Sequence, residues 1–293
     1  MKIIAVIVTY NRCELLKECL AAFDDMIVRP SKVIVVDNAS TDGTSSYLRE
    51  IGKDSFFQIS TLDKNIGGSG GFSYGVKLAM TEGCDWVWLM DDDTIPGADS
   101  LSILCDKVRL DDAIGFASSR VIWTDNTDHV MNIPKFMAGV DEACGCRLVE
   151  SASFVSIMVK GDVIKKIGLP YTEFFIWVDD TEYTQRIVRA GYKGIFVSDS
   201  IVVHKTKDNY GPAIDSAPLS SAWKFYYGQR NSMFLHRRKY GNGIWFLLKE
   251  LNHLRLNLRG IDKRPADERK IFKKYVKKGF WDGLFFKPII EYV

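Results

Sequence analysis

The sequence predicts an α/β protein with a mainly parallel, doubly wound sheet, followed by a helical extension rich in basic and aromatic residues. Three observations support this: apolar, β-branched runs alternate with segments of helical spacing, two of these runs lead into a carboxylate, and the composition changes after residue 214. The 293 residues, 46% of them hydrophobic and 26% charged, are enough to bury a sizeable core. We therefore expect two domains, residues 1–214 and 215–293.

The expected elements follow in chain order. Continuous apolar runs predict strands, and apolar residues at helical spacing predict helices. The first half contains strands at 3–8, 32–37, 57–62, 86–90 and 114–123, with helices at 14–23, 72–81 and 101–109 between them. Residues 124–149 are polar and glycine-rich, and we expect an excursion or hairpin that can reach over a site. Regular order resumes with a strand at 153–159, helices at 162–167 and 180–190, and strands at 194–197 and 201–204.

Composition and charge limit the class of protein. No apolar run approaches the ~20 residues that span a bilayer, and the apolar start is too short for a signal peptide, so we expect a cytoplasmic protein. The six cysteines lack paired Cys-x-x-Cys units, and reduced thiols fit that compartment. Residues 224–293 carry 17 Lys and Arg against 6 Asp and Glu, a net charge of +11, whereas the remainder carries −9. This basic end suits an anionic partner such as phospholipid, nucleic acid or a lipid-linked pyrophosphate.

The most informative motif is the apolar run 86–90, which leads directly into Asp91, Asp92 and Asp93. Carboxylates at the end of a buried strand are costly unless a cation or hydrogen-bond donors receive them. The carboxyl ends of strands are also where open α/β sheets bind ligands. The alternative is a solvated acidic turn.

Two further motifs suit nucleotide binding. Asp37 ends the strand at 32–37 and can accept from a ribose hydroxyl or the N–H of a base, or simply cap the turn; Thr44 can cap the next helix. Residues 65–75 form a glycine-rich loop whose backbone N–H groups can approach a nucleotide. The segment lacks the G-x-G-x-x-G spacing and contains no Gly-Lys-Ser/Thr, which argues against dehydrogenases and P-loop proteins.

A second acidic cluster, Asp179, Asp180 and Glu182, follows aromatic residues that include Trp177 and opens a predicted helix. Carboxylates there can complement the helix dipole, which explains at least one of them. Three beside aromatic residues also fit a sugar-binding surface with a general base. His204 closes the strand at 201–204 and is either a structural histidine or, with the aspartates, a ligand of a divalent metal.

Taken together, six motifs resemble the inverting family 2 glycosyltransferases of the GT-A fold, which have a Rossmann-like sheet. They occur in the family's order over roughly residues 1–210: segments 6–12 and 35–43, Asn65-Ile-Gly-Gly68, the aspartates 91–93, the block 177–182, and Val203-His204. Within the family the chain is most similar to bacterial galactofuranosyltransferases and the related rhamnosyltransferases. The doubled Asp179-Asp180 after a tryptophan and the Gly-Gly-x-Gly-Gly-Phe sequence favour the former.

The resemblance implies roles for individual residues. The nucleotide would contact Thr9, Tyr10, Asp37, Asn65, Gly67, Gly68, Asp91 and Asp92, with Thr9 and Tyr10 beside the uracil and Asp37 accepting its imide N–H. A divalent metal, manganese or magnesium, would be held by Asp91, Asp93 and His204. Asp180 would be the catalytic base, and Trp177, Asp179 and Glu182 would bind the acceptor. Many family members carry an arginine where this chain has Tyr74, so the base contacts of this segment stay open.

These roles imply transfer of a sugar, such as galactofuranose or rhamnose, from a UDP- or dTDP-linked donor to a glycan or lipid-linked acceptor in cell-surface polysaccharide synthesis. The base deprotonates the acceptor hydroxyl while positive charge stabilises the departing diphosphate. The basic end would then meet the inner face of the plasma membrane, as a peripheral protein does, and not nucleic acid. The alternatives are a non-catalytic nucleotide-sugar binding module and a phosphohydrolase, although the haloacid-dehalogenase pattern Asp-x-Asp-x-Thr is missing at both Asp37 and Asp91.

Overall fold

The computed structural model describes residues 1–139, 142–209, 211 and 213–293, which form two compact units. The first unit comprises Met1–Thr172, Asp180–Tyr210 and Ile290–Val293, and the second comprises Glu173–Asp179 and Gly211–Ile289. The chain thus enters the second unit for seven residues just before Asp180 and returns to the first at its C-terminus. The domain boundary expected between residues 214 and 215 stays a prediction.

The first unit is built on a mixed sheet whose long strands are mostly parallel. In the described part of the chain its strands are β1 (Ile3–Thr9), β2 (Lys32–Asp37), β3 (Phe57–Thr61), β4 (Trp86–Asp91), β5 (Thr94–Pro96), β6 (Ile114–Ile122), β7 (Lys135–Phe136), β8 (Glu142–Ala143), β9 (Cys146–Ser151), β10 (Ile157–Lys160) and β11 (Lys193–His204). Their order is β3-β2-β1-β4-β10-β6-β11-β9-β7, with β5 paired to β11 and β8 to β9. β1 to β4, β6 and β11 run the same way, and β10 runs against its neighbours.

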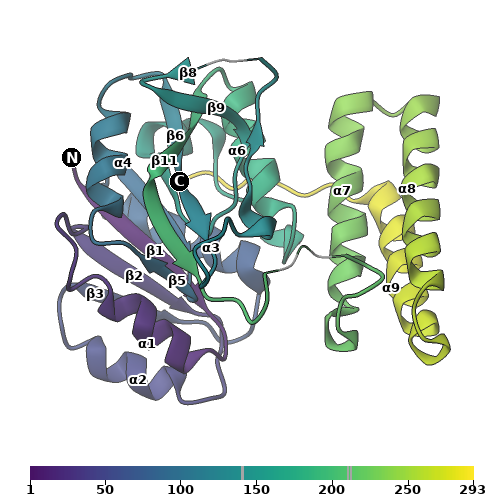
Figure 1. Ribbon diagram of the computed structural model, residues 1–293, viewed down its shortest axis with the longest axis horizontal. Coiled ribbons are helices and arrows are strands. Elements are labelled where there is room, and N and C mark those ends of the chain that lie inside the picture. The colour runs from purple at the N-terminus through teal and green to yellow at the C-terminus, as the bar shows by residue number, and fades with distance from the viewer. Residues whose placement is uncertain (140–141, 210, 212) are drawn as a thin grey trace. The chain divides into compact units, whose positions relative to one another are not determined.

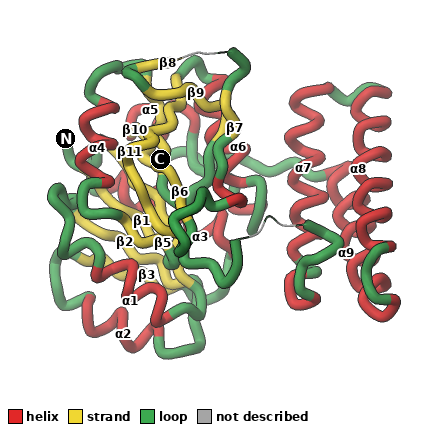
Figure 2. Tube along the Cα trace, in the orientation of Figure 1, coloured by secondary structure: helices red, strands yellow, loops and turns green. Residues whose placement is uncertain are grey.

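Helices cover both faces of this sheet (Figure 2). They are α1 (Cys13–Ala21), α2 (Thr44–Ile51), α3 (Gly67–Thr81), α4 (Ser100–Val108), α5 (Gly161–Ile167) and α6 (Asp179–Arg189). Side chains alternate along a strand, so each strand contributes to two apolar layers. One layer joins β1, β2 and β4 to α1, α2 and α4, and the other joins them to α3, α5 and α6. The prediction of a doubly wound α/β fold is confirmed.

The glycine-rich stretch is helical, which corrects its prediction as a loop. Helix α3 begins at Gly67, whereas the sequence suggested a start at residue 72. The reason is packing against the sheet: a Cβ on Gly71 would lie 2.5 Å from Val8 Cγ1, and one on Gly75 would lie 2.4 Å from Val6 Cγ1. Only glycine lets the helix approach β1 this closely.

Three local expectations are also wrong. Thr44 does not cap α2, because Gly43 occupies the N-cap and Thr44 is the first helical residue. The strand expected at 153–159 begins at Ile157. The two strands expected at 194–197 and 201–204 are one strand, β11, with an irregularity between Val197 and Ile201 that keeps both halves paired with β6.

The excursion at 124–149 contains a short helix, Val130–Asn132, and the small strands β7 and β8, with β9 beginning at Cys146. Residues 140 and 141, also part of that expectation, lie outside the described residues. Cys144 and Gly145, both with positive φ, form the turn between β8 and β9. The Cys-Gly-Cys sequence therefore belongs to a hairpin.

The second unit contains α7 (Lys224–Tyr240), α8 (Ile244–Asp262) and α9 (Ala266–Phe285), which lie side by side in Figure 1. Its interior is aromatic and aliphatic, with Phe225, Phe272 and Val276 in one cluster and Met233, Phe246 and Phe280 in another. The helical extension predicted from the sequence is confirmed. Among the described residues, none of the helices combines the length and apolar character needed to cross a bilayer.

Candidate functional site

The carboxyl ends of three adjacent parallel strands bring the predicted nucleotide and metal residues together. Strand β1 lies between β2 and β4, and the register pairs Thr9 with Asp37 and Val8 with Asp91. The strand order extends from β1 to β2 and β3 on one side and to β4 on the other, so this is the point where the sheet topology reverses. Crevices at such points are the usual ligand sites of open α/β sheets.

Asp91, Asp93 and His204 form a cluster at this edge. Each offers a ligand atom within 4.8 Å of the other two. His204 reaches it because β5 pairs with β11 and places His204 opposite Thr94. The distance from His204 Nε2 to Asp93 Oδ1 is 3.1 Å. Two carboxylates and one imidazole are a ligand set that manganese accepts readily.

The electrostatics of this edge favour a cation. Arg12 contacts two of the aspartates, 3.2 Å from Asp92 Oδ1 and also paired with Asp93, and His204 contacts Asp93, so three carboxylates share one guanidinium and one imidazole. Burial, followed by the charge of Asp93, raises the pKa of Asp91 to about 6. Burial likewise raises the pKa of Asp92 to about 7, although Arg12 acts against the rise. Burial would also raise the pKa of Asp93, but His204 and Arg12 outweigh it and lower this pKa. A divalent ion would balance the excess negative charge, so the residues fit the implied metal.

Three residues that sequence reasoning missed support this cluster. Arg12 lies three positions after Thr9, and a basic residue so close to the end of a strand could have indicated a partner for the aspartates. Asn132 Oδ1 accepts a hydrogen bond from His204 Nδ1 at 2.9 Å, and the His129 ring lies 4.6 Å from the His204 ring. Both come from the excursion, which therefore reaches the predicted metal ligand His204, although no sequence pattern marked these two residues.

The predicted nucleotide residues lie along the same edge and differ in their burial and in their hydrogen bonds. Asp37 is fully buried, and its carboxylate accepts hydrogen bonds from Ser40 N at 2.9 Å and Ser45 Oγ at 2.7 Å. Thr9 Oγ1 donates to Asp92 Oδ2 at 2.7 Å, and Tyr10 is 44% exposed. Contacts of these residues with a base stay predictions.

The start of α3 is fixed by two asparagines. Asn65 Oδ1 accepts from Gly67 N at 2.8 Å, while Asn38, which sequence reasoning missed, binds both Ile66 N and Gly67 O at 2.9 Å. Gly67 has φ +80°, which favours glycine. A Cβ on Gly68 would meet no atom within 4 Å, so this position is open to a ligand.

Asp180 lies in the first turn of α6. It is partly buried, and its Oδ1 accepts from Thr181 N at 2.5 Å and from Thr181 Oγ1 at 3.2 Å. Burial raises its pKa, and the backbone and side-chain hydrogen bonds of Thr181 only partly offset this. Its charge also contributes to the raised pKa of Asp91, so the two carboxylates share one electrostatic environment. A carboxylate with a raised pKa is suited to accept a proton.

The predicted acceptor-binding residues are not equivalent. Glu182 is 1% exposed, and its carboxylate receives two or more hydrogen bonds from Arg186 on the next turn of α6, the shortest 2.7 Å. The i, i+4 spacing in the sequence was a signal for this pair. Trp177 belongs to the second unit, where its ring lies 5.0 Å from that of Phe225. Asp179 is partly exposed at the start of α6.

The segment that leads into Asp180 has an unusual backbone. Phe175, Trp177 and Val178 have φ of 63°, 64° and 72°, values that are strained for residues other than glycine. Asn231 on α7 holds this segment, because its Nδ2 donates to the carbonyls of Phe174, Ile176 and Trp177 at 2.9, 3.2 and 2.9 Å. These contacts lie within the second unit, to which Glu173–Asp179 belong.

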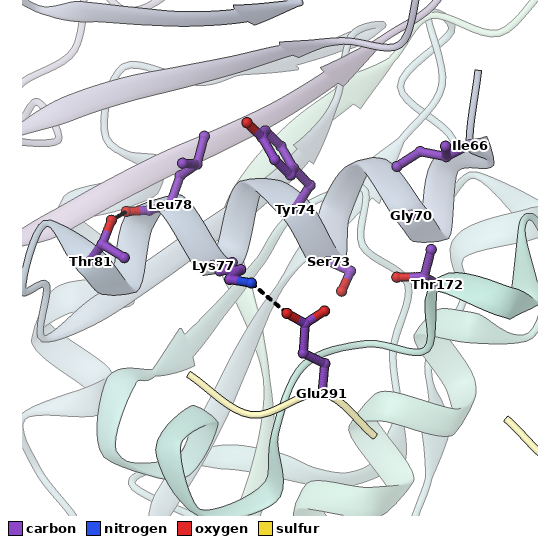
Figure 3. A pocket seen from close by; sticks show the side chains of 9 residues that line it. All are labelled: Ile66, Gly70, Ser73, Tyr74, Lys77, Leu78, Thr81, Thr172 and Glu291. Carbon is purple, nitrogen blue, oxygen red and sulfur yellow. Dashed lines mark hydrogen bonds and ion pairs between the residues drawn. The ribbon is translucent and has the colours of Figure 1, made fainter. Parts of the chain in front are cut away.

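A separate pocket of about 250 Å³ runs along α3 (Figure 3). Tyr74, Leu78 and Gly70 line it, together with an ion pair between Lys77 and Glu291 from the C-terminal tail. Tyr74 Oη also lies 3.1 Å from Ser60 Oγ. None of the aspartates 91–93 lines this pocket, so it is distinct from the strand-end site.

Comparison with known proteins agrees with this geometry. Galactofuranosyltransferase GlfT1 of Mycolicibacterium smegmatis is 29% identical over 204 residues, 64% of this chain and 65% of that protein, so the match spans just under two thirds of the relative. The O-antigen chain rhamnosyltransferase RfbN of Salmonella typhimurium is 26% identical over 225 residues, 72% of this chain and 68% of that protein.

The fold is also similar to that of solved structures. Mannosyltransferase PcManGT from Pyrobaculum calidifontis, solved in complex with GDP-Man and Mn²⁺, superimposes with a TM-score of 0.58 at 16% identity and covers 97% of this chain and 87% of its own. The GT-A type of α/β fold is thereby confirmed. The profile of the family described as "Glycosyl transferase family 2" matches residues 4–155, more than half of the chain. This chain therefore belongs to glycosyltransferase family 2.

Proposed function

We propose that this glycosyltransferase is a metal-dependent, inverting enzyme that transfers galactofuranose or rhamnose to a glycan or lipid-linked acceptor in cell-surface polysaccharide synthesis. The observation that carries the proposal is the cluster of Asp91, Asp93 and His204, whose ligand atoms lie within 4.8 Å of one another at the carboxyl ends of parallel strands. The similarity to GlfT1 and RfbN supports the two candidate sugars.

Each residue has a proposed task in the reaction. Asp180 accepts the proton of the acceptor hydroxyl as that oxygen attacks the anomeric carbon from the face opposite the leaving group. Asp91, Asp93 and His204 hold manganese or magnesium, which when bound supplies the positive charge that stabilises the departing nucleoside diphosphate. Thr9, Tyr10, Asp37, Asn65, Gly67, Gly68 and Asp92 bind and orient the nucleotide. Trp177 and Asp179 contact the acceptor, and the burial of Glu182 beside Arg186 favours a supporting role for that residue.

A screen of donors tests this proposal. Purified protein is mixed with UDP-galactofuranose, dTDP-rhamnose and other UDP-, dTDP- and GDP-sugars, with Mn²⁺, Mg²⁺ or chelator, and both binding and donor hydrolysis are measured. We expect one nucleotide class to bind in a metal-dependent manner and to be hydrolysed slowly without acceptor. The variant Asp93→Ala should lose both. Full activity of that variant in chelator would refute the metal dependence.

The same screen separates the alternatives. A nucleotide-sugar binding module would bind the donor but turn over none, with or without candidate acceptors. A phosphohydrolase would release inorganic phosphate, whereas a glycosyltransferase releases free sugar and an intact nucleoside diphosphate. The products distinguish the two enzyme classes directly.

We also propose that the second unit associates with an anionic membrane surface. The first half of α8 carries apolar side chains that face solvent, among them Ile244, Trp245 and Leu248, and Trp245 is 73% exposed. The exposed basic residues Lys249 and Arg255 follow on the same helix. An aromatic ring at the headgroup level and basic residues, worth ~1 kcal/mol each near anionic lipid, are the features of an interfacial helix.

Co-sedimentation with liposomes tests this association. Binding should rise with the anionic lipid content and fall between 0.1 M and 1 M salt. The double variant Trp245→Ala/Leu248→Ala should sediment less, whereas Leu110→Ala, which alters a 65% exposed leucine of the first unit, should behave as wild type. Equal, negligible binding to neutral and anionic vesicles at low salt would make a soluble acceptor the better proposal.

A further inference from the structure

The helical unit contains a second cluster of metal-ligating side chains, far along the chain from the strand-end site. His236 lies on α7, and Glu250 and His253 lie on α8. One ligand atom of each lies within 4.8 Å of the other two. The spacing of Glu250 and His253 puts both on one face of the helix, an arrangement that metal sites in helical bundles use.

Glu250 is the unusual member of this cluster. It is fully buried and occupies the apolar stripe of α8, one turn after the buried Phe246 and one turn before the partly buried Leu254. An ionised carboxylate in such a position is costly unless charge and hydrogen bonds compensate it. Its Oε1 is 2.5 Å from His236 Nδ1, but Oε2 finds no hydrogen-bond partner among the described residues.

The groups around Glu250 Oε2 leave that atom to a ligand. His253 Nδ1 is 3.8 Å away, beyond hydrogen-bond distance. The nearby guanidinium of Arg237 donates instead to the backbone carbonyls of Gly283, Leu284 and Phe286. Both imidazoles lie within ion-pair distance of Glu250, and the carboxylate oxygen without a hydrogen-bond donor between them is suited to bind a metal ion.

We propose that His236, Glu250 and His253 bind a zinc ion. Two imidazoles and one carboxylate are a common set of three protein ligands for Zn²⁺, which leaves a fourth position for water. The strand-end cluster has the opposite balance, two carboxylates and one imidazole, and so suits a harder ion. The site is reachable, since the side chains of His236 and His253 are 25% and 28% exposed above the buried Glu250.

The surroundings supply supporting contacts. Gln229 Nε2 lies 3.4 Å from His253 Nδ1, and Gln229 Oε1 accepts from Asn257 Nδ2 at 2.8 Å. Because an amide nitrogen only donates, this contact requires an unprotonated His253 Nδ1, and a bound zinc ion would take the place of this weak contact at the same lone pair. A zinc ion here would join α7 to α8 across the short connection that contains Gly241 and Gly243, and so would stabilise the helical unit.

The test uses the full-length protein, stripped with chelator and then titrated with Zn²⁺ alone. Bound zinc is counted by mass spectrometry after gel filtration, and affinity is measured by calorimetry. Asp93→Asn replaces one ligand of the strand-end cluster, and this variant should still bind one zinc ion tightly. Adding Glu250→Gln or His253→Gln to Asp93→Asn should weaken the affinity for that ion at least 100-fold. Zinc should raise the Tm of Asp93→Asn and fail to raise that of the double variants.

Folding of each variant is checked by circular dichroism in chelator, and His236→Gln, which changes a partly exposed side chain, provides a third variant should Glu250→Gln fail to fold. Co²⁺ in place of zinc should give the visible spectrum of a four-coordinate ion with nitrogen ligands. The proposal is overturned if Asp93→Asn binds no zinc, or if the histidine variants bind it as tightly as their parent. Because no readout depends on sugar transfer, a failure here leaves the proposed function untouched, and the reverse also holds.

Discussion

Asp92→Asn should make the protein more stable, because it removes a carboxylate that the fold buries at a cost. Asp92 is 4% exposed, and burial raises its pKa from 3.8 to about 7. Since the pKa of Asp92 is higher in the folded state, the folded protein binds more protons than the unfolded chain between pH 3.8 and about pH 7. The unfavourable contribution is therefore absent below about pH 4, grows as the pH rises, and is complete above about pH 7.

The size of the effect follows from the same shift. About three pKa units at 1.36 kcal/mol each give an upper limit of ~4 kcal/mol above pH 7, which falls to ~2 kcal/mol at pH 5. Asparagine keeps an oxygen for the Thr9 hydroxyl but places an amide donor near Arg12, so we expect a measured gain of ~1–3 kcal/mol in the free energy of unfolding at pH 8. For a chain of this length this is a rise in Tm of ~2–8 °C.

Thermal unfolding followed by circular dichroism, in chelator at pH 5 and pH 8, measures this gain. Chelator is needed because a bound cation would itself relieve the charge. Asp112→Asn, which changes a fully exposed carboxylate, serves as the matched control and should leave the Tm unchanged. If Asp92→Asn is no more stable than wild type at pH 8, or if its gain in the free energy of unfolding is the same at pH 5, the buried charge of Asp92 does not destabilise the protein.

Further predictions concern the base and the packing around it. Asp180→Asn should retain donor affinity and lower the rate of transfer at least ~10²-fold; a larger loss in Asp179→Asn would reverse the two roles. Because burial raises the pKa of Asp180, the wild-type rate should fall with decreasing pH at a pH above the ordinary range of an aspartate, and an unchanged acid limb would argue against this base. Asn231→Ala removes three hydrogen bonds to a strained segment and should cost ~2–4 kcal/mol of stability in denaturant titrations and lower kcat, whereas a normal kcat would restrict Asn231 to a structural role. Gly71→Ala should lower the Tm because its Cβ would lie 2.5 Å from a Val8 methyl, while Gly68→Ala, which meets nothing within 4 Å, should not.

The meeting of Asp37 with the aspartates at 91–93 could be predicted from the sequence. The apolar runs before them read as buried parallel strands, and parallel strands deliver their carboxyl ends to one edge of a sheet. The register that pairs Thr9 with Asp37 and Val8 with Asp91 confirms this. The basic and aromatic extension could also be predicted, because composition and charge are local properties of the chain.

Other features depended on contacts between residues distant in sequence. Glycines at 67–75 read as a loop because their local preference is for irregular backbone, and only the need to pack against Val6 and Val8 makes this segment helical. Asn132 reaches His204 through an excursion without regular periodicity, so nothing in its own segment indicated a role.

The sequence by itself thus determined the fold class and which carboxylates gather at the edge of the sheet, because hydrophobic periodicity and strand direction fix both. The tertiary structure alone decided which distant residues surround the buried polar groups. It placed Asn132 beside His204, and it left Glu250 buried with an oxygen that lacks a hydrogen-bond donor. The physical reason is that the energy of a charge depends on its burial and on its partners, and long-range packing sets both.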